Sequence, residues 1–194
     1  IIDENNAIMF DAVSDFVERA ELVLDSLYNK HLFILKLNEM QAANEITEHL
    51  FDGLPEEFTF RELRERILVQ EREKLFPEKQ RDAALDVVLW LARSNYELKF
   101  NSESPMSERV IFAASENERS GVEDARFVRF VDDDGQVTYY APYTAYNGFT
   151  ILPQLIETRD FVKLKISSLN GKAIQNKGLA LFPRRIKGQY VMLS

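Results

Sequence analysis

Apolar and polar residues follow two different periods along this chain. Up to about residue 95, apolar residues return every three or four positions, which is typical of amphipathic α-helices. From Asn95 onward, β-branched and aromatic residues come in short runs that turn residues interrupt, as in consecutive antiparallel strands. The pattern therefore predicts an α+β chain, with a helical segment over residues 1–95 and antiparallel strands over residues 96–194.

The first two helices are predicted from apolar spacing alone. The second runs over about residues 32–50 and ends before the turn sequence Asp52-Gly53-Leu54-Pro55. The first is predicted from six apolar residues that would share one helical face: Phe10, Val13, Val17, Ala20, Leu24 and Leu27.

The other two helices have recognisable start signals. Thr59, with Glu62 three residues later, makes a capping-box pattern for a helix that runs to about Leu75. Pro77 suits the first turn of a fourth helix, where a backbone N–H would have no partner in any case. The buried face of that helix is predicted to consist of Ala84, Val87, Val88 and Leu91.

Eight strands are predicted after Asn95, and several turns between them contain glycine. These turns include Asn147-Gly148, Asn170-Gly171 and Lys187-Gly188. The acidic run Asp132-Asp133-Asp134-Gly135 lacks the spacing of a calcium loop, so it is interpreted as a further hairpin turn. The strands are predicted at residues 96–100, 110–113, 127–131, 137–145, 152–157, 162–166, 179–184 and 190–193.

Composition excludes several kinds of site and partner. The chain has no cysteine, which excludes disulfides, thiolate catalysis and cysteine-bound zinc. Its two histidines, His31 and His49, are too few for a histidine-rich metal site, so we expect no metal and no organic cofactor. The net charge of −8 arises over residues 1–95, where 20 acidic side chains face 11 basic ones, and residues 96–194 are nearly balanced, so we expect no nucleic-acid partner.

The sequence predicts a cytoplasmic protein without a membrane partner. No apolar run reaches the roughly 18 residues that a membrane-spanning helix needs. The first residues, Ile1-Ile2-Asp3-Glu4, lack the basic region of a signal peptide. Export stays open, because the chain does not begin with Met.

Three segments of the second half carry residue types that suit sugar chemistry. They are Gly121–Arg126, with adjacent carboxylates before an arginine, Tyr143–Gly148, with two tyrosines, and Asn176–Ile186, with a lysine beside a glycine. Successive side chains of an extended segment point to opposite faces, so only one of the two carboxylates faces a given cleft. Tyrosine rings can stack on a sugar ring and hydrogen-bond to its rim.

In this order and spacing, the three segments resemble the catalytic propeller of glycoside hydrolase family 130, whose members phosphorolyse or hydrolyse β-mannosides. The resemblance covers about residues 96–194. It implies a five-bladed β-propeller, of which the predicted strands would supply about two blades. The chain would then be a partial propeller that is inactive alone.

The resemblance implies a role for Asp124 as the general acid and for Lys177 as a contact to substrate or phosphate. A general acid needs a raised pKa, so we expect Asp124 in a concave, partly solvent-excluded site. Two residues on, Arg126 would lie on the same face and hold a carboxylate or a sugar hydroxyl. The remaining expected contacts are a sugar platform at Tyr143 or Tyr146 and a further basic group, for which Arg184 is expected and its neighbour Arg185 is the alternative.

The expected function is inverting cleavage of a β-mannoside or a related β-glycoside, so the expected partner is an oligosaccharide or glycoside. Phosphorolytic members of the family carry an arginine shortly after the position of Gly148, whereas this chain continues Phe149-Thr150-Ile151. The sequence therefore leaves both hydrolysis and phosphorolysis open, with inorganic phosphate as the co-substrate of the second reaction. A non-catalytic carbohydrate-binding module and a structural propeller fragment are the alternatives, and homo-oligomerisation stays open.

Overall fold

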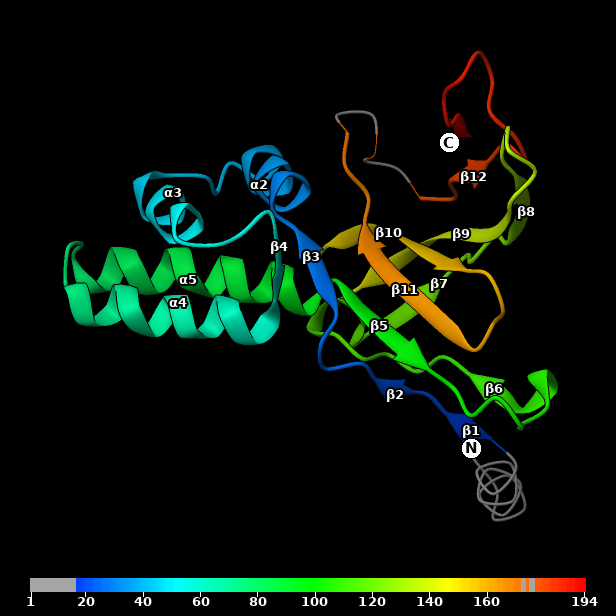
Figure 1. Ribbon diagram of the computed structural model, residues 1–194, viewed down its shortest axis with the longest axis horizontal. Coiled ribbons are helices and arrows are strands. Elements are labelled where there is room, and N and C mark those ends of the chain that lie inside the picture. Colours follow the sequence, from blue (N-terminus) through cyan, green and yellow to red (C-terminus); the bar gives the residue numbers. More distant parts are fainter. Residues whose placement is uncertain (1–16, 172–173, 175–176) are drawn as a thin grey trace.

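The computed structural model describes residues 17–171, 174 and 177–194. Four α-helices of this part lie together at one end of the molecule, and most of the strands form a curled sheet at the other end (Figure 1). This mixture of helices and antiparallel sheet confirms the α+β class that the change of period predicts. The division of the chain at residue 95 into two segments stays a prediction.

The helical cluster consists of α2 (Lys30–Glu39), α3 (Glu45–Asp52), α4 (Phe60–Glu73) and α5 (Glu78–Arg93). The two longest helices, α4 and α5, lie side by side, and α3 packs against both (Figure 1). Their apolar faces meet in one core, which contains Phe33, Leu37, Leu50, Phe51, Leu54, Phe58, Leu63, Ile67, Leu85, Val88, Leu91 and Ala92.

The start signals of the last two helices are confirmed with one small change. The Thr59 side chain accepts a hydrogen bond from the backbone N–H of Glu62, whose carboxylate accepts one from the backbone N–H of Thr59 at 2.7 Å. Pro77 is the residue just before α5 rather than its first helical residue. Of the predicted buried face of α5, Val87 is only partly buried, whereas the other three residues are buried.

The helix predicted from the spacing Phe10 to Leu27 is wrong from residue 17 onward. This stretch forms three short strands, β1 (Glu18–Arg19), β2 (Glu21–Leu22) and β3 (Leu27–Asn29), while Phe10 and Val13 lie outside the described residues. Pairing of β2 with a sheet strand overrides the local period, and Leu24 stays 82% exposed instead of joining a buried helical face.

The single helix predicted over residues 32–50 is split into α2 and α3. After α2, Gln41 adopts a left-handed backbone conformation with a φ of 57°. Asn44 then caps α3, because its side chain accepts hydrogen bonds from the backbone N–H groups of Ile46 and Thr47. An asparagine that bonds to the backbone in this way favours a helix start over a helix interior.

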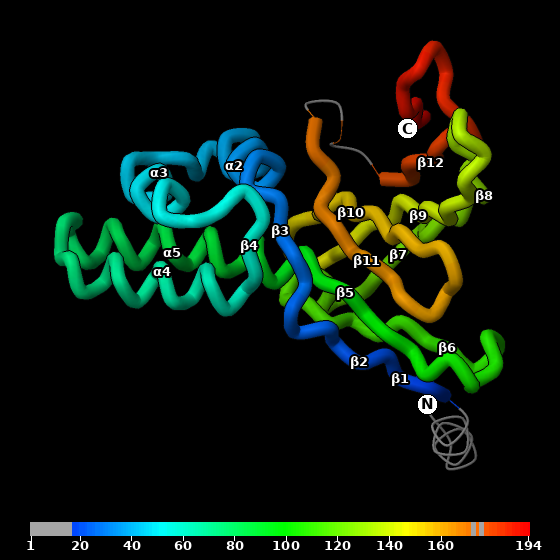
Figure 2. Tube along the Cα trace, viewed as in Figure 1, coloured from blue at the N-terminus to red at the C-terminus, as the bar shows by residue number. Residues whose placement is uncertain are grey.

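The main sheet has seven strands. Six follow one another in the order β2, β5, β11, β10, β9 and β7, and β8 also pairs with β9. Its neighbouring strands are antiparallel. In the long hairpin of β9 and β10 (Figure 2), Tyr146 pairs with Ile151 next to the turn. The strands are β5 (Tyr96–Lys99), β7 (Gly121–Glu123), β8 (Val128–Val131), β9 (Val137–Tyr146), β10 (Ile151–Thr158) and β11 (Lys163–Ser168).

Strands of the second half lie where the sequence predicts them, although some are shorter. Two-residue strands stand in place of three predicted ones: β6 (Arg109–Val110), β12 (Ala180–Leu181) and β13 (Met192–Leu193). The predicted list lacks β7, because its Gly-Val-Glu sequence has no run of β-forming residues. Small additional sheets join β1 to β6, β12 to β13, and β3 to β4 (Glu57–Thr59).

The sheet has a hydrophobic core of its own, separate from that of the helices. It contains Tyr96, Leu98, Phe100, Ala141, Tyr143, Ala145, Ile156, Leu164 and Ile166. In the described part of the chain, no helix is both long and apolar enough to cross a membrane.

Candidate functional site

Asp124 directly follows β7, at the edge of the main sheet. The ladder between β7 and β9 ends at Glu123, which pairs with Thr144. At Asp124 the backbone turns into the left-handed region, with a φ of 58°, a conformation that aspartate tolerates better than most residues. The strict alternation of side chains predicted through this segment therefore stops at Glu123.

Lys177 reaches this edge from a loop more than fifty residues further along the chain. Its Nζ lies 2.9 Å from Oε2 of Glu123 and 5.7 Å from the centre of the Tyr146 ring. The hydrogen bond and the charge of Glu123 raise the pKa of Lys177, and Asp124 and Tyr146 add smaller effects. The lysine is thus held between a carboxylate and an aromatic ring.

Arg126 fixes the same loop through the residue after Lys177. Its Nη1 donates a hydrogen bond to the backbone oxygen of Gly178 at 2.6 Å. Gly178 has a φ of +75°, and a Cβ atom there would lie 3.3 Å from Nη2 of Arg126. Glycine thus permits a close approach here, and the approaching group is a guanidinium of this chain.

Four of the six predicted site residues therefore meet at one place. We call the group formed by Glu123, Asp124, Arg126, Tyr146 and Lys177 the edge cluster. It brings two carboxylates, two cations and one aromatic ring together from three separate segments. Asp124 itself is exposed, so the described residues do not form the concave and partly solvent-excluded surroundings expected for it.

Tyr143 lies in the core of the sheet, which corrects its prediction as a sugar platform. Only 5% of the residue is exposed, and its hydroxyl lies 2.6 Å from Oε1 of Glu118. Burial raises the pKa of Tyr143 well above that of an ordinary tyrosine, and the neighbouring Tyr96 and Glu118 raise it further. Of the two tyrosines, only Tyr146 lies where a sugar could reach it.

Glu118 is the centre of a buried polar network that the sequence interpretation missed. It ends the 3₁₀-helix η2 (Glu116–Glu118) and is 1% exposed. Its carboxylate accepts hydrogen bonds from the hydroxyls of Tyr96, Tyr143 and Ser115, and from the backbone N–H groups of Ala114 and Ser115. The sequence signal for it is the capping-box spacing of Ser115 and Glu118.

The network continues to the junction between the helices and the sheet. Gln154 is fully buried, and its Nε2 donates to the backbone oxygen of Ser94, directly after α5. The side chain of Asn117 donates to the hydroxyl of the same serine. Hydrogen bonds thus tie the end of α5 to η2, which directly precedes β7 and Asp124.

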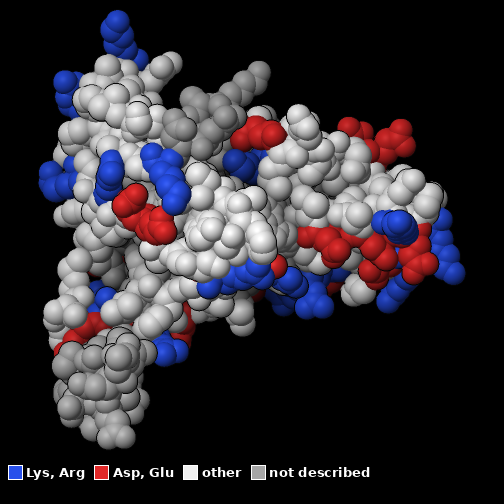
Figure 3. Space-filling model, turned by 180° about the vertical axis from the view of Figure 1, so that it is seen from behind, with Lys and Arg blue, Asp and Glu red and all other residues white. Residues whose placement is uncertain are grey.

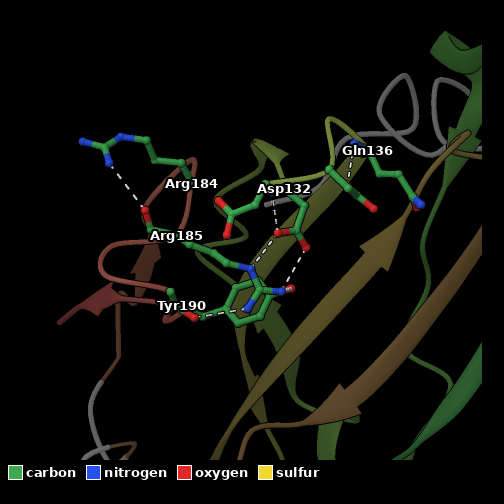
Figure 4. A network of polar contacts seen from close by, with 8 residues as sticks. Asp132, Gln136, Arg184, Arg185 and Tyr190 are labelled. Carbon is green, nitrogen blue, oxygen red and sulfur yellow. Dashed lines mark hydrogen bonds and ion pairs between the residues drawn. The ribbon is translucent and has the colours of Figure 1, made fainter.

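Arg184 does not join the edge cluster. It is exposed, and its Nη1 donates to the backbone oxygen of Arg185 (Figure 4). Arg185 forms a bidentate pair with Asp132, at 2.6 and 3.0 Å, and these hydrogen bonds lower the pKa of Asp132 to about 2. The acidic run at Asp132 forms a turn between β8 and β9, as predicted, and it pairs with an arginine.

Neither the surface charge of the helical cluster nor the cavity between the helices and the sheet indicates a site at the predicted residues. Acidic and basic side chains are interspersed over the helical cluster (Figure 3). A cavity of about 100 Å³ lies at the junction of β3, α2 and β11, where Tyr28, Lys36 and Ser168 line it. None of the six predicted site residues borders this cavity.

Comparison with known proteins gives a weak similarity over part of the chain. No protein-family model matches the chain. Over 83 residues it is 31% identical to a β-1,2-mannobiose phosphorylase from Listeria innocua, a match that covers 43% of this chain and 22% of that enzyme. A solved complex of β-1,2-mannobiose phosphorylase from Listeria innocua with β-1,2-mannobiose resembles the chain with a TM-score of 0.36 and 24% identity. That likeness covers 50% of this chain and 27% of the solved chain, so the chain spans only about a quarter of its relatives' length.

Proposed function

We propose that this chain carries one wall of the active site of a carbohydrate-active enzyme that cleaves a β-mannoside or a related β-glycoside with inversion. The observation that carries the proposal is the edge cluster, in which Lys177 pairs with Glu123 beside Asp124 and lies over the ring of Tyr146, while Arg126 bonds to the residue after Lys177. The similarity to a mannobiose phosphorylase supports the same class of substrate.

In this proposal Asp124 protonates the oxygen of the leaving sugar. Lys177 and Arg126 hold substrate hydroxyls or phosphate, and the ring of Tyr146 carries a sugar face. The main sheet would be part of a β-propeller, whose remaining blades would cover Asp124 and raise its pKa by removing water. That covering would supply the concave surroundings that the described residues do not form.

The proposal includes both phosphorolysis and hydrolysis. No arginine follows Gly148 closely, but Arg119 supplies a guanidinium at the same turn, because its Nε donates to the backbone oxygen of Asn147 at 2.9 Å. The products separate the two reactions, since hydrolysis releases free sugar without phosphate and phosphorolysis forms a sugar 1-phosphate only when phosphate is present.

The test is the turnover of the full-length protein with Asp124→Asn. This variant keeps the shape of the side chain and removes the acid, so we expect the rate to fall by roughly 10²–10⁴-fold. Release of sugar from manno-oligosaccharides, measured by chromatography, gives the rate. Glu123→Gln is the matched control and should be milder, because Glu123 is engaged with Lys177.

Near-full activity of the Asp124→Asn protein would contradict the assignment of the acid. A non-catalytic carbohydrate-binding module is the second candidate, and the exposure of Asp124 favours it. That candidate requires affinity for the sugar without turnover in the wild-type protein.

A further inference from the structure

Helix α4 has apolar residues on two sides, and the helical cluster covers only one of them. Leu63 and Ile67 belong to the core of the cluster. The helix lies along an outer edge of the cluster (Figure 1), and on its outer side Leu68 and Val69 are 48% and 42% exposed. Single exposed leucines are ordinary on protein surfaces, so the residues around this pair decide whether it suits a partner.

Two opposite charges share the outer face of α4 with the apolar pair. Four residues take the positions i, i+3, i+4 and i+7 of one helical face: Glu65, Leu68, Val69 and Arg72. Both charged side chains are exposed, and neither forms an ion pair with another described residue. We call these four residues the α4 face. It carries an acid toward the start of the helix, an apolar centre, and a base toward the end.

This order of charges is complementary to a second copy of itself that runs in the opposite direction. A two-fold axis between Leu68 and Val69 would place each of them beside its own copy. Glu65 and Arg72 are equally far from that axis along the helix, so Glu65 would lie level with Arg72 of the second copy, and the reverse. Parallel packing would instead place Glu65 beside Glu65, where like charges repel each other.

The net charge of α4 also suits contact between two copies of an acidic chain. The helix carries four arginines and four glutamates, so it is neutral, whereas the whole chain has a net charge of −8. Contact through a neutral helix limits the repulsion between two acidic molecules.

The length of α4 sets the strength of such a contact. Its 14 residues span about 21 Å, since each residue adds about 1.5 Å. Contact between two helices of this length buries less than the roughly 1,200 Å² at which standard stable interfaces begin. The α4 face therefore suits a weak dimer.

We propose that two copies of this chain associate through the α4 face, with their α4 helices antiparallel, in a weak dimer. Two symmetric ion pairs between Glu65 and Arg72 set the direction of packing, and Leu68 and Val69 supply the apolar contact. The dimer does not depend on the proposed function, because the α4 face contains no residue of the edge cluster.

Sedimentation velocity of the full-length protein, from about 10 μM to about 1 mM, tests the dimer, since weak interfaces associate in this range. We expect a monomer–dimer equilibrium in the wild-type protein. Glu65→Arg replaces both ion pairs by repulsion and should weaken association roughly 10-fold or more. The double variant Glu65→Arg with Arg72→Glu exchanges the charges and should restore it. Glu71→Arg is the matched control, because it makes the same charge change on α4 outside the α4 face.

Introduced cysteines test the direction of packing, because the chain has no cysteine of its own. Leu68→Cys should form a disulfide-linked dimer on mild oxidation, since residue 68 would meet its own copy near the axis. Arg61→Cys, on the same side of α4 but near its start, should not form one in antiparallel helices. A protein that stays monomeric at every concentration, a dimer that Glu65→Arg leaves unchanged, or faster crosslinking of Arg61→Cys than of Leu68→Cys would each overturn the proposal.

Discussion

The two cores of this molecule are built on different principles. The helical cluster packs twelve apolar residues together, and its buried polar side chains bond locally, as Gln70 of α4 does to the backbone oxygen of Ile46. Below the sheet, Glu118 and Gln154 are buried with Tyr143 in a network of hydrogen bonds. Apolar packing tolerates many arrangements of similar volume, whereas a satisfied polar network permits few. The network includes Glu118 of η2, the element that comes before β7 and Asp124 along the chain.

The largest expected effect on this comparison comes from removing the buried carboxylate of Glu118. Glu118→Ala leaves the hydroxyls of Tyr96 and Tyr143 and two backbone N–H groups without their acceptor, so we expect a loss of about 3–5 kcal/mol in the free energy of unfolding. Denaturant unfolding, followed by far-UV circular dichroism and by the fluorescence of Trp90 in α5, measures the loss.

Two variants give this prediction its controls. Leu63→Ala creates a cavity in the helical core and should cost about 2–5 kcal/mol without altering sugar binding. Glu118→Gln keeps the shape and an acceptor oxygen, so its loss should be smaller than that of Glu118→Ala. If Glu118→Ala costs less than about 1 kcal/mol, the network does not hold the sheet together as described.

Raising the pH should also lower the free energy of unfolding differently in the two cores, with a smaller effect than Glu118→Ala has. Burial raises the pKa of Tyr28 in the helical cluster to about 12, and burial also raises the pKa of Tyr96, Tyr140 and Tyr143 in the sheet. Because the folded pKa exceeds the unfolded value of about 10, the stabilisation is complete below pH 10 and is lost as the pH rises above it. Each such tyrosine should cost at most about 1.4 kcal/mol per pH unit in that range.

Urea midpoints between pH 9 and pH 11 measure this slope. Tyr28→Phe removes one titrating group and should make the slope shallower by one proton, leaving the larger contribution of the sheet. A slope that vanishes in Tyr28→Phe would assign the alkaline loss to the helices instead.

The smallest expected effect concerns a helix end. Thr59→Ala removes the side-chain acceptor for the backbone N–H of Glu62 and should destabilise the chain by about 1 kcal/mol. Thr59→Ser keeps the hydroxyl and should remain close to wild type. Thermal unfolding of the two variants gives the difference, and equal stabilities would show that the capping box contributes little.

Local signals in the sequence were sufficient for most of the fold. The capping box at Thr59, the hairpin turns and the strands from Tyr96 to Ile166 depend on neighbouring residues, and the structure has them in place. The helix predicted around Leu24 is wrong because a strand pairing between distant residues determines the conformation of this stretch. The break between α2 and α3 differs from the prediction for a local reason, because Asn44 carries the signal of a helix start within the predicted single helix.

The candidate site also contains some residues that the sequence indicates and others that it does not. Spacing and resemblance indicated Asp124, Arg126, Tyr146 and Lys177, which meet at the edge cluster. For Tyr143, alternation along a strand predicts which residues share a face but does not say which face is buried. Glu118 was missed because the donors that make its burial tolerable come from segments far apart in the chain.

The connection between β2 and β5 has a consequence for the order of folding. These two strands pair with each other, Leu22 opposite Leu98, so the whole helical cluster is the loop that joins them. Closing so long a loop costs conformational entropy before any strand contact forms. A hydrogen bond from the Tyr28 hydroxyl to the backbone oxygen of Ala92 holds the two ends of the cluster together. Helices that form early would therefore bring β2 to β5 at little further entropic cost, and the edge of the sheet would be completed late.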